Sequence, residues 1–331
     1  MSETGGNRLK TALVCGISGQ DGSLLARLLL AAGYRVVGTS RDAQMSGFRS
    51  LERLNIRDSV EMASMTLTDF RSVLQVLDRF EPDEIYNFAG QSSVGLSFDE
   101  PVETLQSHAI GTLNLLEAIR FLGADCRFYN AGSGECFGDT GGKPANEEMP
   151  FYPRSPYAVA KSAAFWEAVN YRDAYGLYVC SGILFNHESP LRPERFVTRK
   201  VVRAASRIAN GSRERLTLGN LAVKRDWGWA PEYVDAMWRM LQQPSPDDYV
   251  IATGKSNSLE EFVAEAFAYV GLDWREYVSE DRSLYRPAEI LENLGDASKA
   301  RSVLKWTAET LMTDVVRKMV DAEMKGDVAW L

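Results

Sequence analysis

A tyrosine and a lysine four positions apart, Tyr157 and Lys161, have the types and spacing for proton transfer. Ser155 before them is a suitable helix N-cap, and Pro156 suits the first helical position. A spacing of four then places Tyr157 and Lys161 on one face of the predicted helix. A nearby ammonium group, together with the positive ring of a bound cofactor, favours phenolate over phenol, so we expect the two to lower the pKa of the tyrosine toward neutrality. Taken alone, the same spacing also fits a surface tyrosine and a surface lysine.

A second pair of chemically competent residues, Ser133 and Glu135, follows a predicted strand at 126–130. In open α/β sheets, active-site residues collect beyond the carboxyl ends of the strands. Ser133 could hydrogen-bond a hydroxyl or keto oxygen of a substrate. Glu135 has small and apolar neighbours, a setting that can raise the pKa of a carboxyl group and suit it to proton transfer. The alternative is that Glu135 only caps the next segment.

A glycine-rich turn, G-x-x-G-x-x-G, connects the first predicted strand to the first predicted helix. Glycines allow the backbone to approach a pyrophosphate, and the helix N-terminus offers free N–H groups. The turn predicts a dinucleotide site, in which we expect Asp21 to organise the turn rather than touch phosphate. The predicted cofactor-binding residues here are Gly16, Ser18, Gly19, Gln20, Asp21 and Gly22.

The end of the second strand bears on which dinucleotide binds. An NAD site usually has an acidic residue there, whereas an NADP site offers arginine to the 2′-phosphate. Here Ser40 and Arg41 come first and Asp42 follows one position later. The sequence therefore favours NADP, although Arg41 could simply be a solvated strand end.

Composition excludes several other classes of protein. With 37 basic and 45 acidic residues the net charge is −8, which disfavours nucleic acid and anionic membranes as partners. The two histidines, His108 and His187, are too few and too far apart for a His-rich zinc site, and a Ser-His-Asp hydrolase is also unlikely. We predict no metal site. Four scattered cysteines, no long apolar run and no signal-like stretch in residues 1–10 favour the cytoplasm.

The elements that must position these residues alternate between strand-like and helical patterns. Strands are predicted at 11–15, 34–38, 84–89 and 126–130. Helices are predicted at about 23–32, 70–80, 103–121, 259–270 and 308–325. Such alternation implies βαβ units, so we predict an α/β fold with a Rossmann-type doubly wound parallel sheet and a smaller α/β substrate-binding lobe. The predicted dinucleotide domain is 1–185 plus about 226–255, and the predicted lobe is 186–225 and 256–331.

Several longer motifs together resemble those of the extended short-chain dehydrogenase/reductases, and more narrowly the GDP-mannose 4,6-dehydratase family. The resemblance runs from about Thr11 to Met324. Its most specific pieces are GQDG at 19–22, FYPRSPY at 151–157, LFNHESP at 184–190, FVTRK at 196–200, LGNL at 218–221, KRDWG at 224–228 and YRPAE at 285–289.

The resemblance implies a role for each matching residue. It makes Ser133, Glu135, Tyr157 and Lys161 the catalytic residues. It adds His187 and Arg192 to the NADP-binding residues, beside Tyr157 and Lys161. The residues that it implies for GDP-sugar binding, and so for the lobe, are Asn186, Lys200, Arg225, Arg286 and Glu289.

The implied reaction is a dehydration of GDP-mannose in which hydride leaves C4 and returns to C6, with NADP regenerated. Tyr157 would take the C4 hydroxyl proton, and Glu135 would remove the C5 proton and help expel the C6 hydroxyl as water. A C4 epimerase would not need an acid–base group at position 135. Alternatives are dehydration of a related GDP-sugar such as a GDP-heptose, reduction of a GDP-4-keto-6-deoxysugar, and a non-catalytic nucleotide-sugar-binding regulator.

The chain departs from the family pattern at three places. Gly132 and Gly134 flank Ser133, where the family usually has Ser or Thr, and Gly134 adds backbone freedom next to Glu135. Thr66 replaces an Asp expected near the adenine. The loop at 42–46 differs from the one through which relatives reach a neighbouring subunit. The resemblance implies a homo-oligomer, either a dimer or a tetramer.

Overall fold

The structure is a computed structural model that describes residues 8–45, 47–326, 328 and 331. Most of the polar N-terminal stretch at 1–10 therefore lies outside the described residues, as does Ser46 of the loop that follows Arg41.

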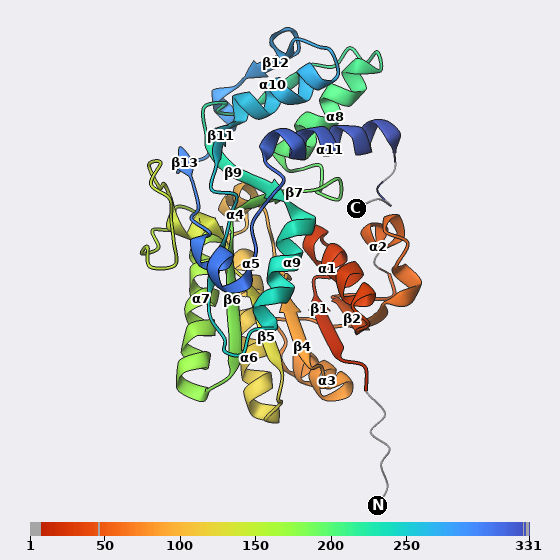
Figure 1. The fold of residues 1–331 in the computed structure, drawn as a ribbon, viewed down its shortest axis with the longest axis vertical. Coiled ribbons are helices and arrows are strands. Elements are labelled where there is room, and N and C mark those ends of the chain that lie inside the picture. Colours follow the sequence, from red (N-terminus) through yellow and green to blue (C-terminus); the bar gives the residue numbers. More distant parts are fainter. Residues whose placement is uncertain (1–7, 46, 327, 329–330) are drawn as a thin grey trace, which may run out of the picture.

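A parallel sheet, together with the helices that cover it, forms the larger part of the molecule (Figure 1). Within the described residues, seven strands pair in the order β3-β2-β1-β4-β5-β6-β10, and each neighbouring pair is parallel. These strands are β1 (Thr11–Cys15), β2 (Arg35–Ser40), β3 (Glu61–Ser64), β4 (Glu84–Asn87), β5 (Arg127–Ala131), β6 (Tyr178–Leu184) and β10 (Tyr249–Ile251). The order reverses between β1 and β4, which confirms the predicted doubly wound sheet and marks the switch point where ligands bind in such folds.

Helices cover both faces of this sheet. Helices α1 (Gln20–Ala31) and α9 (Ala230–Leu241) pack together on one face. Helices α3 (Phe70–Phe80), α6 (Gly111–Leu122) and α7 (Pro156–Tyr175) lie on the other face. Side chains of β1 alternate between the two layers, since Val14 joins the α1–α9 core and Leu13 joins the α3–α6 core. Both residues are fully buried, as expected for a central parallel strand.

The predicted helix at 103–121 is a longer composite helix. It begins as α5 (Pro101–Leu105), with proline in the first turn, and continues through a π-helical turn (Gln106–Ile110) into α6. The π-helical turn carries His108, which is 3% exposed. Two further short helices, α2 (Arg49–Arg53) and α4 (Val94–Asp99), follow β2 and β4.

A smaller lobe with its own core lies at one end of the sheet, at the top of Figure 1. Its central strand is β9 (Lys224–Trp229), which pairs with β7 (Asn186–Glu188), β11 (Ser256–Ser258) and β13 (Glu292–Asn293). Strands β8 (Leu216–Leu218) and β12 (Val278–Glu280) form a separate pair. The helices of the lobe are α8 (Val197–Ala209), α10 (Leu259–Tyr269) and α11 (Met312–Lys325). After β9 the chain returns to the large sheet through α9 and β10.

Three other properties bear on function. None of the helices in the described part of the chain is long and apolar enough to cross a membrane. All four cysteines are buried free thiols. Across the residues that the structure describes, no three His, Cys, Asp or Glu side chains are grouped so that they could hold a metal ion.

Candidate active site

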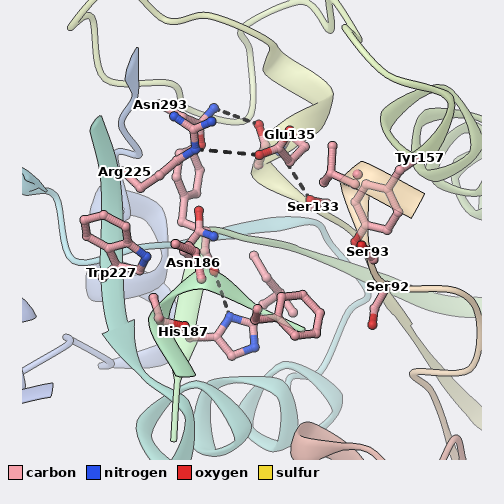
Figure 2. Close-up of a pocket in the computed structure, with 18 of the residues that line it drawn as sticks. Ser92, Ser93, Ser133, Glu135, Tyr157, Asn186, His187, Arg225, Trp227 and Asn293 are labelled. Atoms are coloured by element: carbon pink, nitrogen blue, oxygen red, sulfur yellow. Dashed lines mark hydrogen bonds and ion pairs between the residues drawn. The ribbon is translucent and has the colours of Figure 1, made fainter. Parts of the chain in front are cut away.

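A cavity of about 380 Å³ lies beyond the carboxyl ends of β4, β5 and β6 and is closed on its other side by the lobe (Figure 2). This position agrees with the general rule that ligands of doubly wound sheets bind at the switch point of the strand order. Of the residues predicted from the sequence, those that line it are Asp21, Ser133, Glu135, Tyr157, Lys161, Asn186, His187, Arg192, Arg225, Arg286 and Glu289. Among the described residues, those predicted but absent from this lining are Gly16, Ser18, Gly19, Gln20, Gly22, Arg41 and Lys200.

The N-terminal turn of α7 presents Tyr157 and Lys161 to the cavity. Ser155 caps the helix through its side chain, which accepts a hydrogen bond from Ala158 N at 3.1 Å. Lys161 Nζ donates to Ala131 O at 2.7 Å and lies 5.9 Å from the centroid of the Tyr157 ring. Burial lowers the pKa of Lys161 to about 8. The predicted common face of Tyr157 and Lys161 is confirmed.

In the protein by itself, the pKa of Tyr157 lies above its ordinary value. Burial raises it, because a phenolate is penalised in an apolar site, and the hydrogen bond with Ser133 lowers it only in part. The protein's own groups alone therefore do not lower this pKa, and the fall expected from Lys161 together with the positive ring of a bound cofactor stays a prediction. The ammonium of Lys161 donates to the carbonyl oxygen of Ala131.

Glu135 lies on a short 3-10 helix (Gly134–Phe137) that directly follows β5. Ser133 caps this helix, and its Oγ accepts a hydrogen bond from Glu135 N at 3.2 Å. The carboxylate faces the lobe, where Glu135 Oε1 lies 3.8 Å from Arg225 Nε (Figure 2). Ser133, rather than Glu135, therefore provides the helix cap, and the carboxylate of Glu135 lines the cavity.

The two glycines beside Ser133 fit the packing of this chain. A Cβ atom at Gly132 would lie 2.9 Å from the carbonyl oxygen of Gly182, to which Gly132 N also donates a hydrogen bond. A Cβ atom at Gly134 would lie 3.0 Å from the Phe185 ring. These close approaches explain in physical terms why small residues stand where the family usually has Ser or Thr.

The glycine-rich turn has the shape of a phosphate cradle. Gly16 has φ +80°, and a Cβ atom there would lie 2.9 Å from Ala89 N. A Cβ atom at Gly22 would lie 2.5 Å from the carbonyl oxygen of Gly16. Gly19 is the N-cap of α1, and the exposed Ser18 precedes it. These glycines thus let the turn pack tightly against the backbone after β4 and against the first turn of α1, and a helix N-terminus presented in this way suits a pyrophosphate.

Asp21 and His187 form an ion pair behind this cradle. His187 Nε2 lies 3.0 Å from Asp21 Oδ2, and His187 Nδ1 donates to Phe185 O at 2.7 Å. Both ring nitrogens of His187 are therefore directed at oxygen atoms of the protein. Burial alone would raise the pKa of Asp21, but the charge and hydrogen bond of His187 lower it to about 2. Asp21 is thus paired with His187 within the protein, and its expected role in organising the turn stays a prediction.

Neighbouring side chains hold the same region together. Gln20 donates to the carbonyl oxygen of His187 at 3.1 Å and accepts from Ser189 at 2.9 Å. Arg192 and Glu188 form a two-bond ion pair at 2.9 and 3.1 Å. Both nitrogens of His187 are used within the protein, so it braces the predicted cofactor cradle indirectly.

Two cations expected at the ligands lie apart from the cavity. The Arg41 side chain is 83% exposed and lies 3.7 Å from Glu103. Lys200 is exposed, and its Nζ donates to Thr217 O at 2.9 Å. The backbone N–H of Thr66, at the expected adenine end, donates a hydrogen bond to Ser72 Oγ at 3.0 Å.

Arg225 is more deeply placed than a surface cation. Its side chain is 7% exposed, and its guanidinium donates to the carbonyl oxygens of Lys224 and Ile290, both at 2.9 Å. It lies between Glu135 and Glu289, whose Oε1 is 3.9 Å from Arg225 Nη2. Burial lowers the pKa of Arg225. Much of its bonding capacity is thus used within the protein.

Two residues near the reacting groups were not among the predicted site residues. His108 Nε2 donates to Gln91 O at 2.7 Å, and its ring packs edge-on against Tyr157 at 5.4 Å. Burial, and then the charge of Lys161, holds the pKa of His108 well below its usual range, so the ring is neutral. Asn293 bonds the backbone around Glu135. The sequence pointed to His108 only through the scarcity of histidine. Nothing in the sequence pointed to Asn293.

The fold and the site together define an extended short-chain dehydrogenase/reductase: a doubly wound sheet, a glycine cradle at its switch point, and a Tyr–Lys pair facing Ser133 and Glu135. The profile of a family described as GDP-mannose 4,6 dehydratase matches residues 13–319. The chain belongs to the GDP-mannose 4,6-dehydratase family.

Individual relatives agree with this assignment. GDP-mannose 4,6 dehydratase 2 of Arabidopsis thaliana is 48% identical over 96% of this chain and 87% of its own length. GDP-mannose 4,6-dehydratase of Sinorhizobium fredii is 45% identical over 95% of this chain and 97% of its own length. Among solved structures, UDP-glucose 4-epimerase of Thermus thermophilus in complex with NAD has a TM-score of 0.82 at 25% identity, covering 96% of this chain and 100% of that one.

Proposed function

We propose that this chain is a hydro-lyase that converts GDP-α-D-mannose to GDP-4-dehydro-6-deoxy-α-D-mannose with loss of water. The observation that carries the proposal is the joint presence of Glu135, Tyr157 and Lys161 around one cavity. A carboxylate at position 135 gives the site an acid–base group that a simple C4 oxidation or epimerisation does not require. The close relatives named as GDP-mannose 4,6-dehydratases support the choice of substrate.

We propose NADP as the cofactor. A nicotinamide dinucleotide, when bound, supplies a hydride acceptor and donor at the sugar. The glycine turn supports this choice, because Gly16 and Gly22 let the backbone fold tightly enough to present the N-terminus of α1, whose N–H groups suit a pyrophosphate. Arg41 at the end of β2 is exposed and suits a 2′-phosphate. His187 and Arg192 would support the cradle through their ion pairs with Asp21 and Glu188.

Tyr157 is the proposed base for the C4 hydroxyl. Burial favours the protonated phenol of Tyr157. The side chain can accept the proton of the C4 hydroxyl only as a phenolate, and the phenolate needs a nearby positive charge to stabilise it. Lys161 is on the same face of α7 and is largely protonated below pH 8, which provides that positive charge. Ser133 hydrogen-bonds Tyr157 and can turn to the C4 oxygen.

Glu135 is the proposed acid–base for the elimination. Once C4 is a ketone, the hydrogen on C5 is acidic, and the Glu135 carboxylate can remove it. The protonated carboxyl group then gives this proton to the C6 hydroxyl, which departs as water, so Glu135 is a carboxylate again. As hydride returns to C6, C5 gains a proton, and this gain balances the proton that Tyr157 took from the C4 hydroxyl. The guanidinium of Arg225 faces the Glu135 carboxylate, with Nε 3.8 Å from Oε1.

The nucleotide is proposed to lie along the lobe. Asn186, Arg286 and Glu289 line the cavity on that side, and Glu289 can accept hydrogen bonds from the guanine or the ribose. Arg286 and the exposed Lys200 can meet the diphosphate. Lys200 bonds the backbone of Thr217, two residues before Gly219 in the cavity wall. Arg225 lines the same cavity between Glu135 and Glu289.

We also propose that the chain forms a homo-oligomer, either a dimer or a tetramer. Support comes from large apolar side chains that are exposed along α5 and α7, among them Val102, Val159 and Trp166. Light scattering of the purified protein tests this, and a monomer at micromolar concentration would refute it.

The test of the proposed function is incubation of the purified protein with GDP-mannose and a catalytic amount of NADP⁺. We expect a 4-keto-6-deoxy product in large molar excess over the cofactor. Parallel incubations with a GDP-heptose, and with a GDP-4-keto-6-deoxysugar plus NADPH, test the two alternative reactions. Absence of the dehydrated product, with stoichiometric oxidation of NADPH by the keto sugar, would refute the proposal and identify a reductase.

A further inference from the structure

Asn293 joins the lobe to the segment that carries Glu135. It is the last residue of β13, is 1% exposed, and pairs in register with Arg225 of β9. Its side-chain Nδ2 donates to the carbonyl oxygens of Gly134 at 3.1 Å and Gly138 at 3.0 Å. These carbonyls lie on either side of Glu135, and Figure 2 shows Asn293 and Arg225 facing this residue together.

The backbone around Glu135 needs such a partner. The 3-10 helix Gly134–Phe137 is a single turn, so its carbonyls have few partners of their own. Glycine stands at both of its ends, and Gly138 has φ +71°. Two glycines give this segment more conformational freedom than most residues would allow. The amide of Asn293 restricts that freedom at both ends of the turn with one nitrogen.

Both hydrogens of the Asn293 amide are used by these two carbonyls. An amide nitrogen has two donors, whereas a carboxylate has none and an aliphatic side chain has no polar group. The same register that places Asn293 against the backbone places Arg225 beside the Glu135 carboxylate, with Nε 3.8 Å from Oε1. At the edge formed by β9 and β13, Asn293 thus holds the backbone around Glu135, and Arg225 lies opposite the Glu135 carboxylate.

We propose that Asn293 is a positioning residue for Glu135, required for proton transfer at C5 and C6 and not for oxidation at C4. This inference rests on the proposed dehydratase function. C4 chemistry depends on Tyr157 and Lys161, which are held by α7 and by Ala131 O. A shift of Glu135 would therefore slow elimination selectively, because proton transfer depends steeply on the position of the acid–base group.

Two variants test the proposal. Asn293→Asp keeps the size of the side chain but places an acceptor against two carbonyl oxygens, and Asn293→Ala removes the donor with less repulsion. With GDP-mannose, we expect turnover to fall roughly 10- to 100-fold. Reduced nicotinamide should meanwhile accumulate on the enzyme, seen by its absorbance, because C4 oxidation continues. NADP⁺ binding should stay within about twofold of wild type.

Thr140→Val is the matched control. Thr140 Oγ1 donates to Glu292 O at 3.3 Å and accepts from Leu294 N at 3.2 Å, so it also ties β13 to the loop after Glu135. It bonds neither Gly134 nor Gly138 through its side chain. We expect Thr140→Val to show no accumulation of the reduced cofactor. An equal accumulation in this variant would overturn the proposal.

A readout independent of turnover separates this inference from the proposed function. Amide hydrogen exchange at residues 134–138 should accelerate in both Asn293 variants and remain near wild type in Thr140→Val. Unchanged exchange in folded Asn293→Ala, or equal losses of C4 oxidation and dehydration, would overturn the positioning role. Failure of the proposed function would instead appear in the wild-type protein, as no dehydrated product from GDP-mannose.

Discussion

Replacing Lys161 with methionine should stabilise the fold at neutral pH while removing turnover. The lysine is 7% exposed, and burial lowers its pKa from the ordinary 10.5 to about 8. That shift corresponds to about 3 kcal/mol of unfavourable free energy for keeping the charged form in the folded protein. Methionine has no charge to bury but leaves Ala131 O without its partner, which costs about 1–2 kcal/mol. The expected net gain in the free energy of unfolding is about 1–2 kcal/mol.

The pH dependence of this gain provides the sharper test. Below pH 8, Lys161 is protonated in both the folded and the unfolded chain, so its full cost is present. Between pH 8 and 10.5 the unfolded chain holds a proton that the folded chain has released, so wild-type stability rises with pH. Lys161→Met lacks this titration. Its advantage should therefore shrink by about 2 kcal/mol between pH 7 and about pH 9.5.

Urea denaturation of both proteins across this pH range measures the difference, in which the titrations of other groups cancel. Lys143→Met, at an exposed lysine in the loop after Glu135, is the control and should differ from wild type by less than about 0.5 kcal/mol at each pH. A Lys161→Met advantage that is constant with pH would refute the reasoning. A Lys161→Met protein that is less stable than wild type by the same amount at every pH would refute it too.

Three further predictions concern the other proposed roles. Tyr157→Phe should abolish turnover while NADP⁺ binding, measured by calorimetry, stays within about twofold, because only the proton acceptor is lost; undiminished activity would contradict the assignment. Arg41→Ala should weaken NADP⁺ binding by about 10-fold or more and leave NAD⁺ binding nearly unchanged; equal effects on both would exclude a 2′-phosphate contact. Asp21→Asn should lower the free energy of unfolding by about 2 kcal/mol at pH 7, because the His187 contact lowers the pKa of Asp21 to about 2. Wild type should lose this contribution as the pH falls from 3.8 toward 2, so a difference that persists there would contradict the ion pair.

Features that depend on local sequence could be predicted. The relation of Tyr157 to Lys161 is set by a single helix, whose start is marked by Ser155 and Pro156. The glycine turn between β1 and α1 is local too, as is the helix at Phe70–Phe80, which occupies the predicted range. In each case, capping, backbone freedom and helical periodicity act over a few residues.

Features that depend on tertiary contacts could not be read from spacing. The Asp21–His187 pair joins residues 166 positions apart, and Asn293 reaches Gly134 over 159 positions. The sequence also treated Lys200 and Arg225 alike as cations, whereas the fold exposes Lys200 and buries Arg225 between two glutamates. That the pKa of Tyr157 is raised in the protein by itself could not be predicted for the same reason, because burial is a property of the whole fold.

The proposed reaction moves a hydrogen within one hexose while water is lost. It can be measured with GDP-mannose that carries deuterium at C4, a catalytic amount of unlabelled NADP⁺ and the wild-type protein, followed by mass spectrometry and NMR of the product. We expect a 4-keto-6-deoxy sugar with the deuterium at C6. A dehydrated product without deuterium at C6, or deuterium that collects in the cofactor instead, would contradict it.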